Sequence, residues 1–112
     1  MDAPELDIKI FIDCERPEGL PTLEEIVQKC QTFDVEQAEA PFTDFSKRGF
    51  VLESKDGTQV AFVKHGSDIA MSEAITQNFV WMKFKDDPTV DVPVVYLAFK
   101  EGTLGYIVME LI

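Results

Sequence analysis

The spacing of hydrophobic residues changes along the chain, and the first regular stretch has the spacing of a helix. Within residues 20–33, Thr22 and Glu25 have the spacing of a reciprocal N-terminal cap, and the apolar residues at helical spacing are Leu23, Ile26, Val27 and Cys30. We therefore predict a short amphipathic helix there. Residues 34–49 have a mixed pattern that Pro41 interrupts, which predicts a connection that includes a turn or two of helix.

From Gly49 onward the pattern predicts a compact run of strands and one helix. Residues 49–66 alternate around a turn at Lys55, Asp56 and Gly57, which favours a β-hairpin, and residues 94–112 form a second hairpin rich in β-branched and aromatic residues. Between them, residues 70–85 form a predicted amphipathic helix with the stripe Ala70, Met71, Ala74, Ile75, Asn78, Phe79 and Met82. We predict an α+β fold, with a small antiparallel sheet of about four strands and one helix packed across it.

The charge divides the 112 residues into two parts. The net charge is −11; residues 1–45 hold twelve acidic and three basic residues, a balance of −9, and residues 46–112 hold nine and seven, a balance of −2. We describe residues 1–45 as an acidic N-terminal segment with one helix and residues 46–112 as a β-β-α-β-β lobe. The negative electrostatic field of this charge repels polyanions, so we expect no nucleic-acid partner. The acidic segment is either a solvated face or a docking surface for a basic partner.

The apolar runs, the cysteines and the single histidine limit the classes of function that we expect. No apolar run is long enough to cross a membrane, and the acidic N-terminus is unlike a basic leader, so we expect a cytoplasmic protein with no membrane partner. Cys14 and Cys30 lack metal-site spacing; reduced thiols are favoured over a disulfide or a reactive site. With His65 as the sole histidine and no hydrolase or metal motif, we predict no catalytic or metal-binding residue of those classes.

Lys64 and Glu73 are the one pair of residues for which the sequence suggests a chemical role. Lys64 lies near the end of a predicted strand, and Glu73 lies in the first turns of the helix that follows. A strand lysine reaches the α- and β-phosphates of a nucleotide when a helical carboxylate holds it in place and keeps it charged. The alternative is an exposed lysine and an unrelated glutamate.

Four blocks extend this interpretation, namely VKHG, MSEA, DVPVVYLAF and GTLGYIVMELI, in that order within residues 60–112. This stretch resembles the kinase-like phosphotransferases of the aminoglycoside phosphotransferase and choline kinase group, especially its fungal members. The resemblance implies a kinase-like N-terminal lobe that uses ATP and Mg. It makes Lys64 the phosphate-contacting lysine, Glu73 its partner, and residues 109–112 the start of the hinge, where backbone groups at Glu110 and Ile112 bond the adenine.

The resemblance also implies that Val63 and Ile107 line the adenine cleft, with ordinary core packing as the alternative. The sequence departs from the family pattern after Pro93, where Val94 and Val95 stand in place of a second proline and a lysine, and it has no glycine-rich phosphate loop.

The family's catalytic aspartate, the asparagine after it and its metal-binding aspartate follow the hinge and have no counterpart here. The resemblance therefore implies an ATP-binding lobe truncated at the hinge, with weak nucleotide binding and no transfer activity alone, and the assignment as an enzyme stays open. The alternative is a non-catalytic α+β interaction module that uses its acidic front. An exposed lobe face would support self-association or a protein partner.

Overall fold

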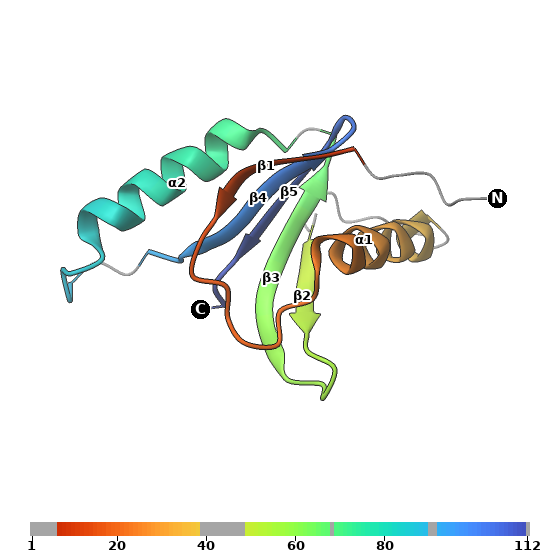
Figure 1. Ribbon diagram of the computed structural model, residues 1–112, viewed down its shortest axis with the longest axis horizontal. Helices are drawn as coiled ribbons and strands as arrows, with labels where there is room; N and C mark the ends of the chain where they lie inside the picture. Colours follow the sequence, from red (N-terminus) through yellow and green to blue (C-terminus); the bar gives the residue numbers. More distant parts are fainter. Residues whose placement is uncertain (1–6, 39–48, 68, 90–91, 112) are drawn as a thin grey trace.

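The computed structural model describes residues 7–38, 49–67, 69–89 and 92–111, and these form one antiparallel sheet with two helices (Figure 1). The elements are β1 (Ile8–Asp13), α1 (Leu23–Ala38), β2 (Gly49–Glu53), β3 (Gln59–Gly66), α2 (Met71–Phe84), β4 (Val95–Glu101) and β5 (Leu104–Met109). The strand order is β1-β4-β5-β3-β2, with every neighbouring pair antiparallel. The predicted α+β class is confirmed, and the sheet has one strand more than expected.

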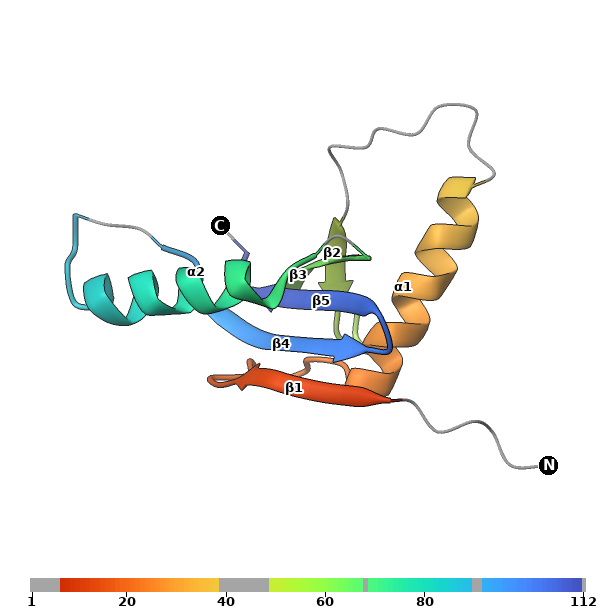
Figure 2. The same ribbon diagram turned by 90° about the horizontal axis from the view of Figure 1, so that it is seen from above.

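The two helices cover opposite faces of the sheet (Figures 1 and 2). On one face, Ile26, Val27 and Cys30 of α1 pack in a buried cluster with alternate residues of the strands, including Val63 and Tyr106. On the other face, a smaller cluster joins α2 to the remaining alternate residues; its members are Met71, Ala74, Val95, Ala98, Ile107 and Met109. Each face of the sheet is therefore covered in part by one helix. Helix α1 belongs to the acidic N-terminal segment, so this segment contributes to the larger buried cluster.

The aliphatic residues before Glu110 belong to strand β5. It lies in the middle of the sheet, between β4 and β3, and residues 105–109 are all buried. A central strand covered on both faces has no solvent side, so its sequence is continuously apolar instead of alternating. The second predicted hairpin is confirmed as β4 and β5.

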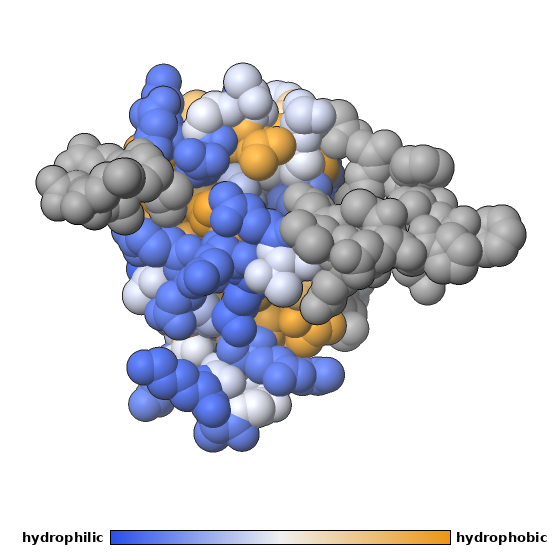
Figure 3. Space-filling view, turned by 90° about the vertical axis from the view of Figure 1, so that its right-hand side faces the viewer, coloured by the Kyte–Doolittle hydropathy of each residue, from blue (hydrophilic) through white to orange (hydrophobic). Residues whose placement is uncertain are grey.

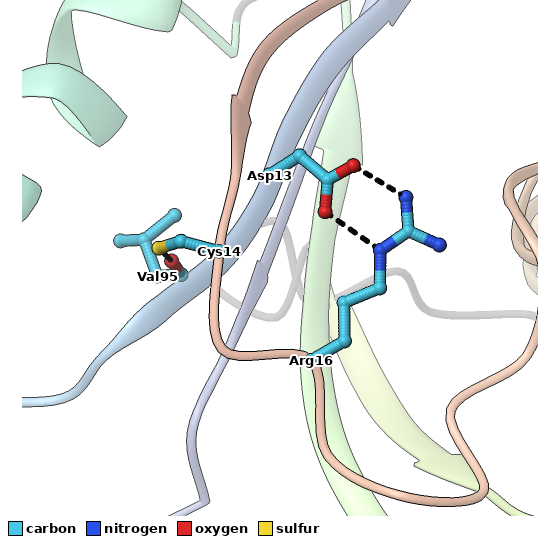
Figure 4. A network of polar contacts seen from close by, with 4 residues as sticks. All are labelled: Asp13, Cys14, Arg16 and Val95. Atoms are coloured by element: carbon cyan, nitrogen blue, oxygen red, sulfur yellow. Dashed lines mark hydrogen bonds and ion pairs between the residues drawn. The ribbon is translucent and has the colours of Figure 1, made fainter.

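Strand β1 was not predicted. It pairs antiparallel with β4, from Ile8 opposite Glu101 to Asp13 opposite Leu97. Just after its C-terminal end, the Cys14 amide donates to the Tyr96 carbonyl at 2.9 Å and the Cys14 thiol to the Val95 carbonyl at 3.3 Å. In the turn that follows, Arg16 donates two hydrogen bonds to the Asp13 carboxylate, at 2.7 and 2.8 Å (Figure 4). Part of the acidic N-terminal segment is thus an edge strand. The boundary that we placed between residues 45 and 46 lies outside the described residues.

Helix α1 begins as its sequence predicts. The Glu25 amide donates to Thr22 Oγ1 at 3.2 Å, and the Thr22 amide donates to Glu25 Oε1 at 3.3 Å, which is the reciprocal capping box. The helix continues to Ala38, five residues beyond the predicted end at residue 33. These five residues agree with the turn or two of helix that we expected within residues 34–49.

Helix α2 confirms the predicted helix but not all of the predicted stripe. Met71 and Ala74 are buried, whereas Ile75, Phe79 and Met82 are 52%, 67% and 60% exposed. The N-terminal half of α2 lies over the strands, and the C-terminal half extends past them (Figures 1 and 2). The outer part of the stripe therefore lies on an exposed helix face, the kind of surface that the expected self-association requires.

The β2–β3 hairpin is also confirmed, with Gly57 in its turn at a φ of 87° that favours glycine. The Asp56 carboxylate accepts hydrogen bonds from the Ser54 hydroxyl and the Thr58 amide, and these bonds lower the pKa of Asp56 to about 2. No helix in the described parts of the chain has the length and apolar character that crossing a membrane would require.

Candidate functional site

The connection between β3 and α2 brings Lys64 and Glu73 together. After β3, the Ile69 amide donates to the Gly66 carbonyl, and the Glu73 amide donates to the Ala70 carbonyl at the start of α2. This tight path turns the chain back over the sheet within a few residues. It places the first turn of α2, where Glu73 lies, next to the C-terminal half of β3.

The expected ion pair is present. Lys64 Nζ lies 3.1 Å from Glu73 Oε1 with hydrogen-bond geometry, and the two side chains are 39% and 48% exposed. A pair this accessible contributes about 0 to 1 kcal/mol to stability. Its contribution to the fold is therefore small, and the ammonium group remains accessible to solvent.

Alternation along β3 decides which residues share the face of Lys64. Phe62, two positions earlier, packs with the cluster beneath α2, whereas Val63 is fully buried in the cluster beneath α1. Because successive strand residues point to opposite faces, Val63 faces away from Lys64. The expectation that Val63 lines a cleft beside Lys64 is therefore wrong, and Val63 is a core residue.

Ile107 is also a core residue. It pairs with Lys64 across the β3–β5 ladder and so lies on the same face, but it is 1% exposed in the cluster beneath α2. Its side chain has almost no surface to offer a ligand. Ile107 instead forms the apolar floor on which α2 rests.

Phe62, which the sequence analysis did not single out, and Met109, which it placed at the start of the hinge, both lie near Lys64. They are opposite each other in the β3–β5 ladder, on the face that carries Lys64. Phe62 is half-buried and Met109 is 8% exposed. The signal was available, because the period of two that defines β3 places position 62, and not position 63, on the side of position 64.

The predicted hinge positions have different outcomes. The Glu110 amide donates to the Val94 carbonyl at 2.8 Å, and its carboxylate accepts from the Val94 amide at 3.3 Å. Its N–H is therefore engaged, and its carbonyl is the backbone group that could serve an adenine. Ile112 lies outside the described residues, and its predicted role stays a prediction.

The two described cavities lie away from this pair, on the α1 side. One, of about 510 Å³, lies between α1 and β2, and the other, of about 670 Å³, adjoins the β2–β3 turn. Lys64 and Glu73 line neither cavity. The ion pair therefore lies outside these two cavities, and its side chains are 39% and 48% exposed.

A nucleotide requires donors for its phosphates and an acceptor for its base. Lys64 supplies an ammonium group and Glu110 a carbonyl, so both ends have a suitable partner. For magnesium the fit is poor, because within the described ranges no three His, Cys, Asp or Glu side chains come together. We therefore assign no magnesium ligand to these residues.

Comparison with known proteins adds no relative to these observations. No family model, curated protein or solved structure matches the chain.

Proposed function

We propose that this chain is the nucleotide-binding lobe of a kinase-like phosphotransferase and that it holds ATP through Lys64. The observation that carries the proposal is the ion pair between Lys64 on β3 and Glu73 on α2, 3.1 Å apart on an accessible face. A kinase-like lobe needs this pairing of a strand lysine with a carboxylate on the next helix. The resemblance of residues 60–112 to that family supports the same assignment.

Lys64 would bind the α- and β-phosphates. Its ammonium has three N–H donors, and one of them is directed to Glu73. The other donors are available to phosphate oxygens. The hydrogen bond to Glu73 limits the rotation of the lysine side chain, so that less conformational entropy is lost when a phosphate binds.

The base would lie toward the Met109 end of β5. Half-buried Phe62 and the more deeply buried Met109 lie near Lys64 on its face of the sheet, and Glu110 follows Met109 directly. Two to three strand residues span about 7 to 10 Å, which is the scale of the ribose that separates a base from its phosphates. The Glu110 carbonyl would then accept a hydrogen bond from the exocyclic amino group of adenine.

Binding would be weak, because a ligand site normally buries most of its ligand and this face covers one side. In a kinase-like enzyme, the groups that bind magnesium and position the acceptor follow the hinge. Magnesium would arrive on the phosphates of the nucleotide. The decisive measurement on these 112 residues is therefore nucleotide binding, not phosphoryl transfer.

The test is a titration of the ¹⁵N-labelled chain with MgATP, followed by amide shifts. We expect saturable shifts near Phe62 and Glu73 with a millimolar dissociation constant. Lys64→Met should weaken binding about tenfold or more, since a hydrogen bond between charged groups contributes about 1.5 to 3 kcal/mol. Glu73→Gln should weaken it less, because the lysine remains.

The matched control is Lys83→Met, which removes the same charge from the last turn of α2. We expect its affinity to stay within about twofold of the wild type, because surface charges at that separation are largely screened. Absence of saturable binding at 10 mM MgATP, or equal affinity of Lys64→Met and the wild type, would refute the proposal.

A further inference from the structure

A groove runs along β2 on the side of the sheet that carries α1. Its upper part lies between α1 and the consecutive β2 residues Phe50 to Glu53, and its lower part continues past the β2–β3 turn. The two cavities share Glu25, Lys29 and Glu53, so they form one continuous depression. Their volumes are about 510 and 670 Å³.

One wall of this groove is the open edge of the sheet. Strand β2 is last in the strand order, and among the described strands only β3 pairs with it. The outer edge of a terminal strand presents backbone N–H and C=O groups that have no partner in the sheet. Half-buried Phe50 and partly exposed Val51 add apolar contact area beside this edge.

The register of β2 limits where a further strand could pair. The β2–β3 ladder is regular from Gly49 to Leu52 and shifts between Leu52 and Glu53, where Val60 is passed over, so the extra residue lies on β3 and β2 itself is continuous. An irregularity of this kind increases the local twist of the strand pair beyond Leu52. A ligand strand would therefore pair along Gly49–Leu52 and reach Glu53 with its side chains.

The groove has a negative charge. Its acidic lining residues are Glu18, Glu25, Glu53 and Asp56, and its basic ones are Lys29 and Lys55. Hydrogen bonds lower the pKa of Asp56 to about 2, and bonds from Thr22 lower the pKa of Glu25, so both stay ionised at neutral pH. Figure 3 shows the side of the molecule that carries α1, where most of the visible surface is hydrophilic and apolar areas are small.

We propose that this groove binds an extended, basic segment of another protein as a sixth strand along β2. Main-chain hydrogen bonds to the strand edge would provide affinity, and the acidic lining would select lysine and arginine side chains. A second copy of the chain is disfavoured as the occupant, because each copy has a net charge of −11 and an acidic groove. This surface is separate from the Lys64 face, so the proposal does not depend on nucleotide binding.

The probe is a six-residue peptide of alternating lysine and valine, added to the ¹⁵N-labelled chain and followed by amide shifts and calorimetry. Two control peptides separate the contributions. One replaces every lysine with glutamate, and the other keeps the sequence but is N-methylated at every residue, which removes its backbone donors. We expect the first peptide to shift the amides of Gly49–Leu52 and the two controls to bind at least about fivefold more weakly.

The protein variants remove the same charge from two places. Glu25→Gln/Glu53→Gln should weaken binding of the basic peptide at least about fivefold, and glutamine at position 25 preserves the helix cap. Glu24→Gln/Glu101→Gln changes two acids that do not line the groove and should leave the affinity within about twofold. Because the attraction is electrostatic, affinity should also fall between 50 and 500 mM salt.

Four results would overturn the proposal. They are absence of binding at millimolar peptide, equal binding of the N-methylated or acidic peptide, equal loss of affinity in the two double variants, and amide shifts at Gly49–Leu52 that appear with protein concentration alone. The last result would assign the strand edge to a second copy.

Discussion

Replacement of Gly105 by alanine tests the contact that positions α2. Gly105 lies in β5 opposite Gly66 of β3, and a Cβ atom added to it would lie 2.3 Å from the carbonyl oxygen of Ile69. The same atom would lie 3.2 Å from the Ile69 carbonyl carbon and Cβ. Ile69 belongs to the short link between β3 and α2, so this contact sets the distance of the helix from the sheet.

The loss of unfolding free energy in the Gly105→Ala variant can be estimated from this geometry. A carbon and an oxygen in weak contact stay about 3.3 Å apart, so the backbone at Ile69 would have to move by about 1 Å. Overpacking costs about 1 to 3 kcal/mol, and we expect the upper part of that range because the obstacle is backbone. With an unfolding entropy of about 2.1 cal/mol/K per residue, a loss of 2 to 3 kcal/mol lowers the melting temperature by roughly 9 to 13 °C.

Urea unfolding and thermal denaturation followed by circular dichroism measure this loss. Amide shifts in the Gly105→Ala variant should extend from Ile69 to Glu73, because the displaced link carries the start of α2. An unfolding free energy within about 0.5 kcal/mol of the wild type would refute the close approach.

Gly57 provides the matched control, because its Cβ would meet no atom within 4 Å and its φ of 87° is the only obstacle. Alanine at position 57 should cost about 1 to 2 kcal/mol, and asparagine should recover part of this loss because it tolerates the left-handed conformation. Asparagine at position 105 should be worse than alanine, because the restriction there is space. Similar effects of asparagine at both positions would contradict this distinction.

Further predictions concern the helix cap, the hairpin turn and the thiols. Thr22→Ala should lower the free energy of unfolding by about 1 kcal/mol, and Thr32→Ala by less than about 0.5 kcal/mol, as measured by urea unfolding; equal losses would contradict a specific cap. The folded-state pKa of Asp56 is about 2 against a usual 3.8, so its contribution to stability is complete above pH 4 and is lost as the pH falls toward 2. Asp56→Asn should flatten the dependence of unfolding free energy on pH in that window, and an unchanged slope would contradict the turn contacts. Burial raises the pKa of the Cys14 thiol, so at pH 8.5 iodoacetamide should modify it more slowly than free cysteine. Cys30, which is 1% exposed, should react only on unfolding; mass spectrometry that finds Cys30 labelled as fast as Cys14 in the folded chain would contradict its burial.

Short-range signals predicted most of the local structure. The cap formed by Thr22 and Glu25 and the turn around Gly57 involve residues within a few positions of each other, and both are present. In such features, the atoms that stabilise the structure belong to the same short stretch as the pattern. Distant residues were therefore not needed to predict them.

Strand β1 shows where a local pattern was insufficient. Ile8, Ile10 and Ile12 alternate with other residues, which is the period of a strand, but the partner is β4, more than 80 positions later in the chain. An isolated strand has no stability of its own, because its backbone groups need a neighbour. Only the folded sheet decides whether such a segment pairs.

In the candidate site, too, some features follow from the local sequence and others depend on tertiary packing. The spacing from Lys64 to Glu73 permitted the ion pair, and the structure contains it. The choice of Phe62 over Val63 as the neighbour of Lys64 follows from the period of the strand, whereas the burial of Ile107 depends on where α2 rests. The role of the pair in nucleotide binding remains a proposal.

The sequence by itself determined the period of each element, its caps and turns, and the placement of acidic residues in the first 45 positions, because these depend on neighbouring residues. Tertiary structure decided which faces are covered. It placed α1 and α2 on opposite sides of the sheet, left Ile75, Phe79 and Met82 exposed beyond the strands, and set β2, the edge strand among the described strands, beside α1. Burial is a property of surfaces that meet in space, and the residues that form those surfaces are far apart in the chain.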